Sequence, residues 1–162
     1  MNEASASGNA AETPVAALVH HVLERYHRPL RSELDQLVRL AERVCDTERA
    51  HPSCPHGLAD HLRDTAASID DHLTKEERIL FPMILAGRSR QVQMPIRVML
   101  GEHEDHAASL ARTRALTQGL EPPADASFPW MELYRGLRAR ETSLNAHIRF
   151  ENEVLFPRAL RA

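Results

Sequence analysis

Apolar residues recur every three or four positions along four long stretches of this chain, and this spacing is typical of amphipathic helices. The stretches run from about 14 to the high forties, and over about 58–86, 94–118 and 127–160. The connections are short, so neighbouring helices should run antiparallel. We therefore expect an all-α fold, an up-down-up-down antiparallel four-helix bundle over residues 14–162, preceded by a disordered tail over residues 1–13.

Single residues set the expected ends and faces of these helices. Pro29 lies inside the first stretch, so a kink is expected where the carbonyl of Arg25 loses its usual donor. Gly87 is expected to end the second helix. The predicted inward residues of the third helix are Ile96, Met99, Leu100, His103, Ala107 and Leu110. Those of the fourth are Met131, Tyr134, Leu137, Leu144, Ile148, Glu151 and Leu155.

Composition supports helices and excludes several classes of function. The 162 residues suit one domain, and an aromatic content of 4% is low for a β-sandwich or barrel. The net charge of −3 gives no basic field, so we expect no nucleic-acid partner and no membrane partner. No apolar run approaches the roughly 18 residues that span a bilayer, and the first residues do not form a secretory signal. Two cysteines make no disulfide scaffold, which favours a cytoplasmic location.

The motif H-x3-E-x3-L-F-P occurs twice, near the end of the second and of the fourth predicted helix. It contains His72 and Glu76 in the first copy, and His147 and Glu151 in the second. Residues four apart lie on the same face of a helix, one turn above the other. Both pairs fall on inward faces, where a carboxylate is costly unless it is paired or bound to a metal. The repeat therefore predicts a metal site in the core.

Two further histidines, His27 and His103, fall on the inward faces of the other two helices. With a rise of about 1.5 Å per residue, the heights of the four histidines agree within roughly 8 Å, so they can meet near one end of the bundle. The predicted metal ligands are His27, His72, Glu76, His103, His147 and Glu151. Two bridging carboxylates and four imidazoles suit a pair of irons, with positions left for an oxide or hydroxide bridge and for O₂ or NO. Ligand type alone suits iron, zinc or manganese about equally.

The chain has ten histidines, and the remaining ones have weaker claims on a metal. His106 faces partly inward and is expected to be solvated or to support a ligand. Glu102 is expected to accept a hydrogen bond behind a ligand or line an access path, or else to be exposed. The histidines expected on the surface or in loops are His20, His21, His51, His56 and His61.

A second pattern, E-x-x-H, is typical of ferritin-like di-iron bundles and occurs at Glu24–His27 and Glu48–His51. His27 and Glu48 are 21 residues apart. One continuous helix would separate them by about 30 Å, so they cannot serve one centre. The pair His20 and Glu24 has the spacing of the repeated motif but lacks its L-F-P tail, and about one such pair is expected by chance.

With its two H-x3-E-x3-L-F-P motifs and its histidines on the other two helices, the chain resembles the hemerythrin-like (HHE) cation-binding domain. More narrowly, it resembles the di-iron iron–sulfur cluster repair (RIC) proteins in RYH at 25–27, KEERILFPMI at 75–84, EHE at 102–104 and ENEVLFPRAL at 151–160. The resemblance covers about residues 15–160. It implies a non-haem di-iron centre whose ligands are the four inward histidines, with Glu76 and Glu151 as bridges. It also implies a cytoplasmic role in nitrosative or oxidative stress.

Two departures refine this resemblance. Oxygen-carrying hemerythrins have a second histidine one turn before the ligand of the third helix, whereas this chain has Met99 there, which favours the RIC-like group. RIC proteins usually also have an N-terminal domain with a cysteine pair, whereas only about thirteen residues precede the predicted bundle here.

Three hypotheses follow for function. The first is a di-iron (Fe²⁺/Fe³⁺), oxo- or hydroxo-bridged protein of the stress response that binds NO or O₂ and supports iron–sulfur cluster repair, with damaged iron–sulfur proteins as partners. The alternative is a hemerythrin-like O₂ or NO sensor or scavenger without repair activity. The third is a structural bundle without metal.

Overall fold

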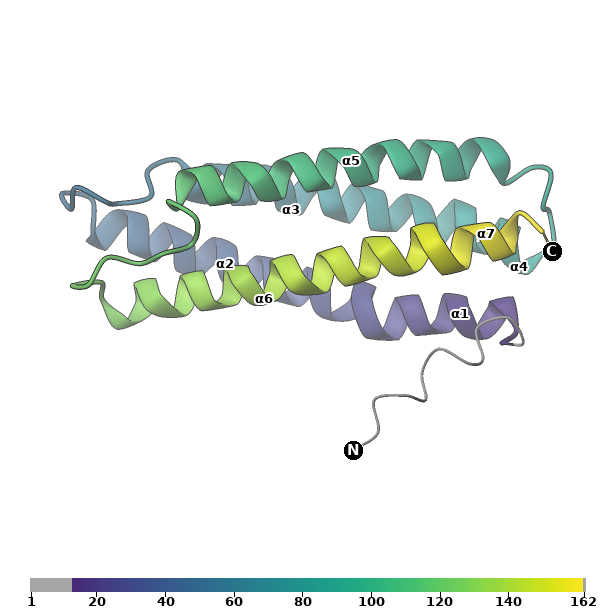
Figure 1. The fold of residues 1–162 in the computed structure, drawn as a ribbon, viewed down its shortest axis with the longest axis horizontal. Helices are drawn as coiled ribbons and strands as arrows, with labels where there is room; N and C mark the ends of the chain where they lie inside the picture. Colours follow the sequence, from purple (N-terminus) through teal and green to yellow (C-terminus); the bar gives the residue numbers. More distant parts are fainter. Residues whose placement is uncertain (1–12, 162) are drawn as a thin grey trace, which may run out of the picture.

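The computed structural model describes residues 13–161, which form four helical rods lying side by side (Figure 1). The elements of the rods are, in chain order, α1 (Val15–Val22), η1 (Leu23–His27) and α2 (Arg28–Thr47); α3 (Leu58–Lys75), η2 (Glu76–Leu80) and α4 (Phe81–Leu85); α5 (Gln93–Leu116); and α6 (Phe128–Phe150), η3 (Glu151–Leu155) and α7 (Phe156–Ala159). Successive rods run in opposite directions, which confirms the predicted four-helix bundle. The predicted tail over residues 1–13 lies, apart from Thr13, outside the described residues.

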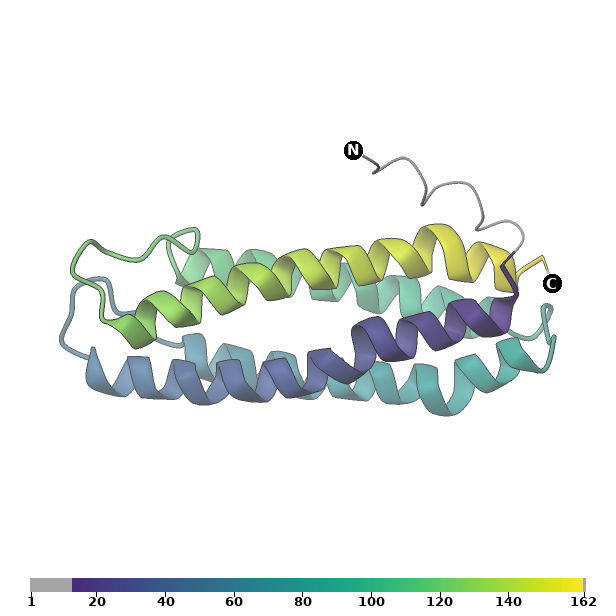
Figure 2. The ribbon, with the colours of Figure 1, turned by 90° about the horizontal axis from the view of Figure 1, so that it is seen from below.

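Three of the rods contain one turn of π-helix just before a proline. In each, the residue that precedes the proline donates its N–H to the carbonyl five residues back: Arg28 to Leu23, Phe81 to Glu76 and Phe156 to Glu151. Proline has no N–H, so the α-helical ladder loses a bond here, and a widened turn accommodates the loss. The kink predicted at Pro29 takes this form, and Figure 2 shows the first rod bending between α1 and α2. Pro82 and Pro157 have the same effect, where the sequence predicted continuous helices.

Buried apolar side chains form three clusters along the bundle. The first, at the end of the bundle where α1 begins and α7 ends, includes Leu80, Phe81, Leu155 and Phe156. The middle cluster joins Leu30, Leu34, Ile69, Leu73, Leu110 and Leu144, and the third, at the far end, includes Trp130 and Leu137. The residues of the two H-x3-E motifs lie between the first and the middle cluster along their helices, so apolar layers close the polar site on both sides.

The faces of the third and fourth rods differ from the prediction in detail. The structure buries His106 in place of Ala107, and Trp130 in place of Met131. Leu100 is also exposed rather than buried. Steps of three and of four residues both keep a side chain on one helical face, so spacing alone does not decide between neighbours.

The predicted helix end at Gly87 is confirmed. Gly87 has a positive φ of 67°, a conformation in which a side chain would be strained, and the N–H of Arg88 closes the turn on the carbonyl of Met83. Among residues 13–161, no helix is both long enough and apolar enough to cross a membrane.

Candidate metal centre

All six residues predicted as ligands lie together in the interior of the bundle. The π-turns place three of them, because His27 ends η1 while Glu76 and Glu151 begin η2 and η3. The others lie on α3, α5 and α6, and every one of the six is at most 3% exposed. The six are His27, His72, Glu76, His103, His147 and Glu151.

Their donor atoms form two groups that share both carboxylates. One group contains His27 and His147 and the other contains His72 and His103, each together with Glu76 and Glu151. Within each group, one donor atom per residue lies within 4.8 Å of the others. This arrangement fits a two-metal site, in which each ion would be held by two imidazoles and would share both carboxylates.

The close approaches in the site are not hydrogen bonds. The Nε2 atoms of His103 and His147 lie 3.1 and 3.0 Å from the two oxygens of Glu151, and Nε2 of His27 lies 3.2 Å from Oε2 of Glu76. Yet these nitrogens and all four carboxylate oxygens are buried without a partner in hydrogen-bond geometry. Buried polar atoms are nearly always hydrogen-bonded. Imidazole nitrogens and carboxylate oxygens that converge without hydrogen-bonding one another are therefore suited to binding a cation.

The charges of the buried carboxylates also favour a bound cation. Burial, together with the neighbouring Glu151, raises the pKa of Glu76 to about 8. Burial disfavours the charged form of His27, but Glu151 and Glu76 outweigh it and raise the pKa of that imidazole to about 9. Without a metal, the two carboxylates thus draw protons into the core. Metal ions would supply the same positive charge and displace these protons.

Three of the four histidines are held from behind by an acceptor on Nδ1. The acceptors are Glu77 for His27 at 2.9 Å, Glu102 for His72 at 2.8 Å and Asn152 for His103 at 2.7 Å. An oxygen acceptor keeps the proton on Nδ1, so Nε2 presents its lone pair to the interior. Lys75 and Arg31 in turn pair with Glu102 and Glu77. Of the expectations for Glu102, the structure shows the acceptor role, toward the predicted ligand His72.

The fourth histidine differs. His147 has a buried Nδ1 without a partner, and its ring lies against Tyr26 with centroids 5.1 Å apart and an interplanar angle of 9°. Contact with an aromatic face orients the ring but fixes no tautomer.

The L-F-P tails of the two motifs form part of the site. Phe81 stacks on His27 at 5.5 Å, and Phe156 stacks on His103 at 5.9 Å. Glu77 and Asn152 occupy the same place in the two motifs, directly after the motif glutamate. Glu77 accepts a hydrogen bond from His27, and Asn152 accepts one from His103. Each motif therefore supplies a histidine, a carboxylate, an acceptor and an aromatic wall. The equivalence of Glu77 and Asn152 is visible in the sequence, yet sequence reasoning missed their role.

The other six histidines range from buried through half-buried to exposed. His106 is more buried than expected, with its ring 4.7 Å from that of His72. His61 is half-buried rather than exposed, and its Nε2 contacts Thr113 at 3.0 Å. His51 lies at the far end of the bundle against Trp130, which agrees with the exclusion of a ferritin-like site. His20, His21 and His56 are exposed, as predicted.

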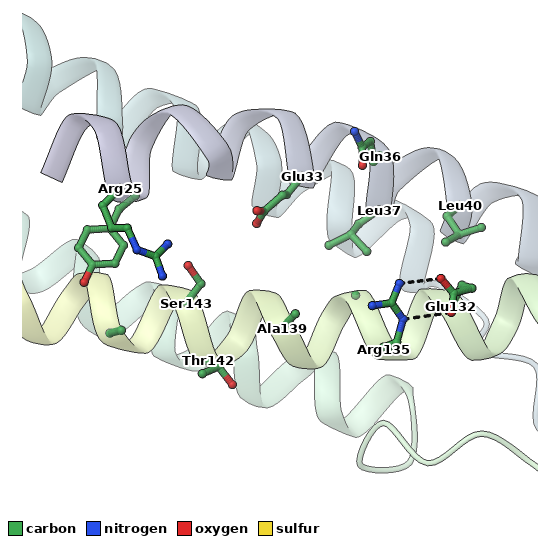
Figure 3. Close-up of a pocket in the computed structure, with 13 residues that line it drawn as sticks. Arg25, Glu33, Gln36, Leu37, Leu40, Glu132, Arg135, Ala139, Thr142 and Ser143 are labelled. Atoms are coloured by element: carbon green, nitrogen blue, oxygen red, sulfur yellow. Dashed lines mark hydrogen bonds and ion pairs between the residues drawn. The ribbon is translucent and has the colours of Figure 1, made fainter. Parts of the chain in front are cut away.

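Two hollows adjoin the site. A narrow gap on its inner side, with no room for a water-sized molecule, lies between His72, His103, His106 and His147 and apolar side chains that include Leu144. A larger open groove of about 670 Å³ runs along the outside between the first and fourth rods (Figure 3). Arg25 and Ser143 lie at one end of this groove. Tyr26, which stacks on His147, also lines it. Tyr26 therefore separates His147 from the groove.

Comparison with known proteins gives concordant matches. The family model described as the hemerythrin HHE cation binding domain matches residues 18–159. The iron-sulfur cluster repair protein YtfE of Musicola paradisiaca is 42% identical over 153 residues, which cover 94% of this chain and 69% of that protein. The YtfE of Yersinia pestis is 41% identical over 162 residues, or 98% and 72% of the two chains. A probable iron-sulfur cluster repair protein of Haemophilus influenzae is 40% identical over 145 residues, or 90% and 65%.

Proposed function

Since this chain belongs to the hemerythrin HHE cation-binding family, we propose that it is a non-haem di-iron protein of the nitrosative and oxidative stress response that supports the repair of iron–sulfur clusters. The observation that carries the proposal is the pair of buried donor groups that share two carboxylates. Metal binding follows from the family, whereas the number and identity of the ions belong to the proposal. We place the protein in the cytoplasm.

In this proposal the ions are held by His27 and His147 on one side and by His72 and His103 on the other, with Glu76 and Glu151 shared. When bound, two irons supply redox chemistry and open coordination positions for a small molecule. The chain itself fixes the tautomers through Glu77, Glu102 and Asn152 and keeps water away with the apolar clusters above and below.

The proposed small-molecule ligands are NO and O₂. Both are small and nearly apolar, and the side chains on the inner side of the centre are Leu and Ile apart from the imidazoles of His72, His103, His106 and His147. An apolar lining of this kind favours such molecules over ions and larger polar molecules.

Repair is favoured over sensing or scavenging alone by the names of the relatives, which are iron-sulfur cluster repair proteins. The sequence match extends over nearly the whole of this chain. Damaged iron–sulfur proteins are the proposed partners, and iron held at this centre is the material they would need.

The test has two parts. The purified protein is first assayed for iron and for its absorption spectrum before and after NO; two irons per chain and an NO-dependent spectral change are expected. It is then mixed with an NO-damaged iron–sulfur enzyme, and recovery of that enzyme's activity is measured against the Glu151→Ala variant. A chain that binds NO stoichiometrically but restores no activity would be a binding module, and a chain without metal would contradict both proposals.

A further inference from the structure

The bundle buries an arginine that no function assigned above uses. Arg140 lies on the inner face of α6, one turn from the buried Leu137 and one turn from the buried Leu144, and it is 1% exposed. Its Nε, Nη1 and Nη2 atoms all lack a hydrogen-bond partner. Among residues 13–161 it is the one arginine that is buried, and it forms no ion pair there.

Residue spacing gives the height of Arg140 in the bundle relative to the metal centre. Arg140 lies seven residues before His147, and Thr65 lies seven residues before His72 on the parallel rod. On the two antiparallel rods, Leu34 and Leu110 lie seven residues after His27 and His103. These four residues therefore form one layer, about 10 Å from the metal centre, at 1.5 Å per residue. The layer lies where the middle apolar cluster gives way to the far one.

The surroundings of Arg140 offer no anionic partner. Glu141, the next residue, points to the surface and pairs with Arg114 at 2.9 Å. Polar groups on the neighbouring rods bond one another: Thr65 bonds Ser109 at 2.8 Å, and Thr113 bonds His61 at 3.0 Å. Arg140 is also close enough to His61 to disfavour its charged form, in the same direction as burial.

Arg140 nevertheless keeps its charge at neutral pH. Burial lowers the pKa of its guanidinium only to about 10. A charged guanidinium in an apolar interior is strongly disfavoured unless an acceptor or a counter-charge accompanies it. The donors therefore need a partner that residues 13–161 do not supply.

We propose that Arg140 binds a small monovalent inorganic anion inside the bundle. A single negative charge neutralises the single positive charge. The planar fork of N–H donors pairs best with a planar oxyanion, so nitrite and nitrate should bind more tightly than chloride. This site is distinct from the metal centre and does not depend on the ligands assigned there.

The first test is the thermal unfolding of the metal-loaded protein at constant ionic strength. Sodium gluconate is replaced stepwise by sodium nitrite, nitrate or chloride. The wild type should show a saturable rise in Tm of about 5 °C, with nitrite and nitrate acting at lower concentration than chloride. In Arg140→Met, which keeps length and removes the charge, the rise should vanish, while Tm in gluconate stays equal or increases. Arg135→Met, on the exposed side of the same helix, should respond like the wild type. An equal response in Arg140→Met would overturn the proposal.

The second test needs no variant. Crystals of the wild type soaked in sodium bromide should give an anomalous peak within hydrogen-bond distance of the Arg140 guanidinium, and the peak should weaken when nitrate is added. Density for water alone at that position, with bromide above the concentration at which chloride saturates the Tm shift of the wild type, would contradict an anion site. Absence of any anion-dependent Tm shift in the wild type would do the same.

Discussion

The two halves of the metal centre are built from equivalent positions, yet they are supported unequally. His103 and His72 in one half correspond to His27 and His147 in the other, because the H-x3-E-x3-L-F-P motif is used twice. The residue before His103 is Glu102, which accepts a hydrogen bond from His72 at 2.8 Å. The residue before His27 is Tyr26, which stacks on His147 and accepts nothing from it.

A second difference lies three residues further along each helix. His106 follows His103 and packs against His72, whereas Leu30 takes the corresponding place after His27. The half that contains His147 is thus held by fewer hydrogen bonds, and its outer wall, Tyr26, borders the open groove of Figure 3. If two ions are bound as proposed, the ion beside His147 should be held less firmly and should leave first. An unequal pair would suit the proposed role in supplying iron for repair.

The largest effect is expected where the halves meet. Glu151→Ala removes a carboxylate that both donor groups share, so both ions should be lost, and Glu76→Ala should act alike. Metal content per chain, measured on protein whose helicity is unchanged, checks this result. His106→Ala is the control and should keep nearly all its iron. Equal loss in all three variants would show that the ligands are assigned wrongly.

A smaller effect on metal binding is expected from loss of the hydrogen-bond acceptor of one ligand, His103. Asn152→Leu removes the acceptor of His103 Nδ1 and should weaken metal binding in that half about 10- to 100-fold, as loss of such partners usually does. Competition with a metal chelator measures the affinity. Asn145→Leu makes the same change at an exposed site on α6 and should leave affinity unchanged. If Asn152→Leu binds both ions as the wild type does, the acceptor has no such role.

The aromatic support of His147 should matter less. Tyr26→Leu removes the stacked ring and should speed release of one of the two ions by about two- to tenfold, since such contacts contribute about 0.5–1.5 kcal/mol. Release to a chelator, followed by absorbance, should then separate into a faster and an unchanged phase. Tyr26→Phe keeps the ring and should behave like the wild type. A uniform acceleration of both phases would count against unequal halves.

The smallest effect concerns pH and His106. Burial, together with the charge of His103, lowers the pKa of His106 to about 4, below the value near 6.5 of an unfolded chain. The unfolded state therefore takes up this proton first, so the contribution of His106 to stability is complete above pH 6.5 and is lost as the pH falls toward 4. Urea unfolding of the metal-free protein is measured at pH 7 and at pH 5. The free energy of unfolding should fall less between these two pH values in His106→Leu than in the wild type. Identical losses would contradict this.

Much of this molecule could be predicted from its sequence. The bounds of the rods follow from apolar spacing, and four of the six central residues follow from a repeated motif that places carboxylates on buried faces. The other two, His27 and His103, follow from their inward faces and matching heights. What spacing cannot resolve is a choice between neighbours one position apart, so Ala107 was predicted inward where His106 is buried.

Two further features of the structure could not be predicted from the sequence, for other reasons. Arg140 fell in the gap between Leu137 and Leu144 and was passed over because a charged residue is rarely buried. The acceptors Glu77 and Asn152 reach across to histidines 50 and 49 residues away, and only the packing of the rods sets such contacts.

The central claim is that one buried site holds two irons between two shared carboxylates. Anomalous diffraction at the iron edge on crystals of the iron-loaded protein tests it most directly. The account predicts two peaks about 3.5–4 Å apart, one beside His27 and His147 and one beside His72 and His103, with the first weaker after brief exposure to a chelator. A single peak, or peaks away from Glu76 and Glu151, would contradict it.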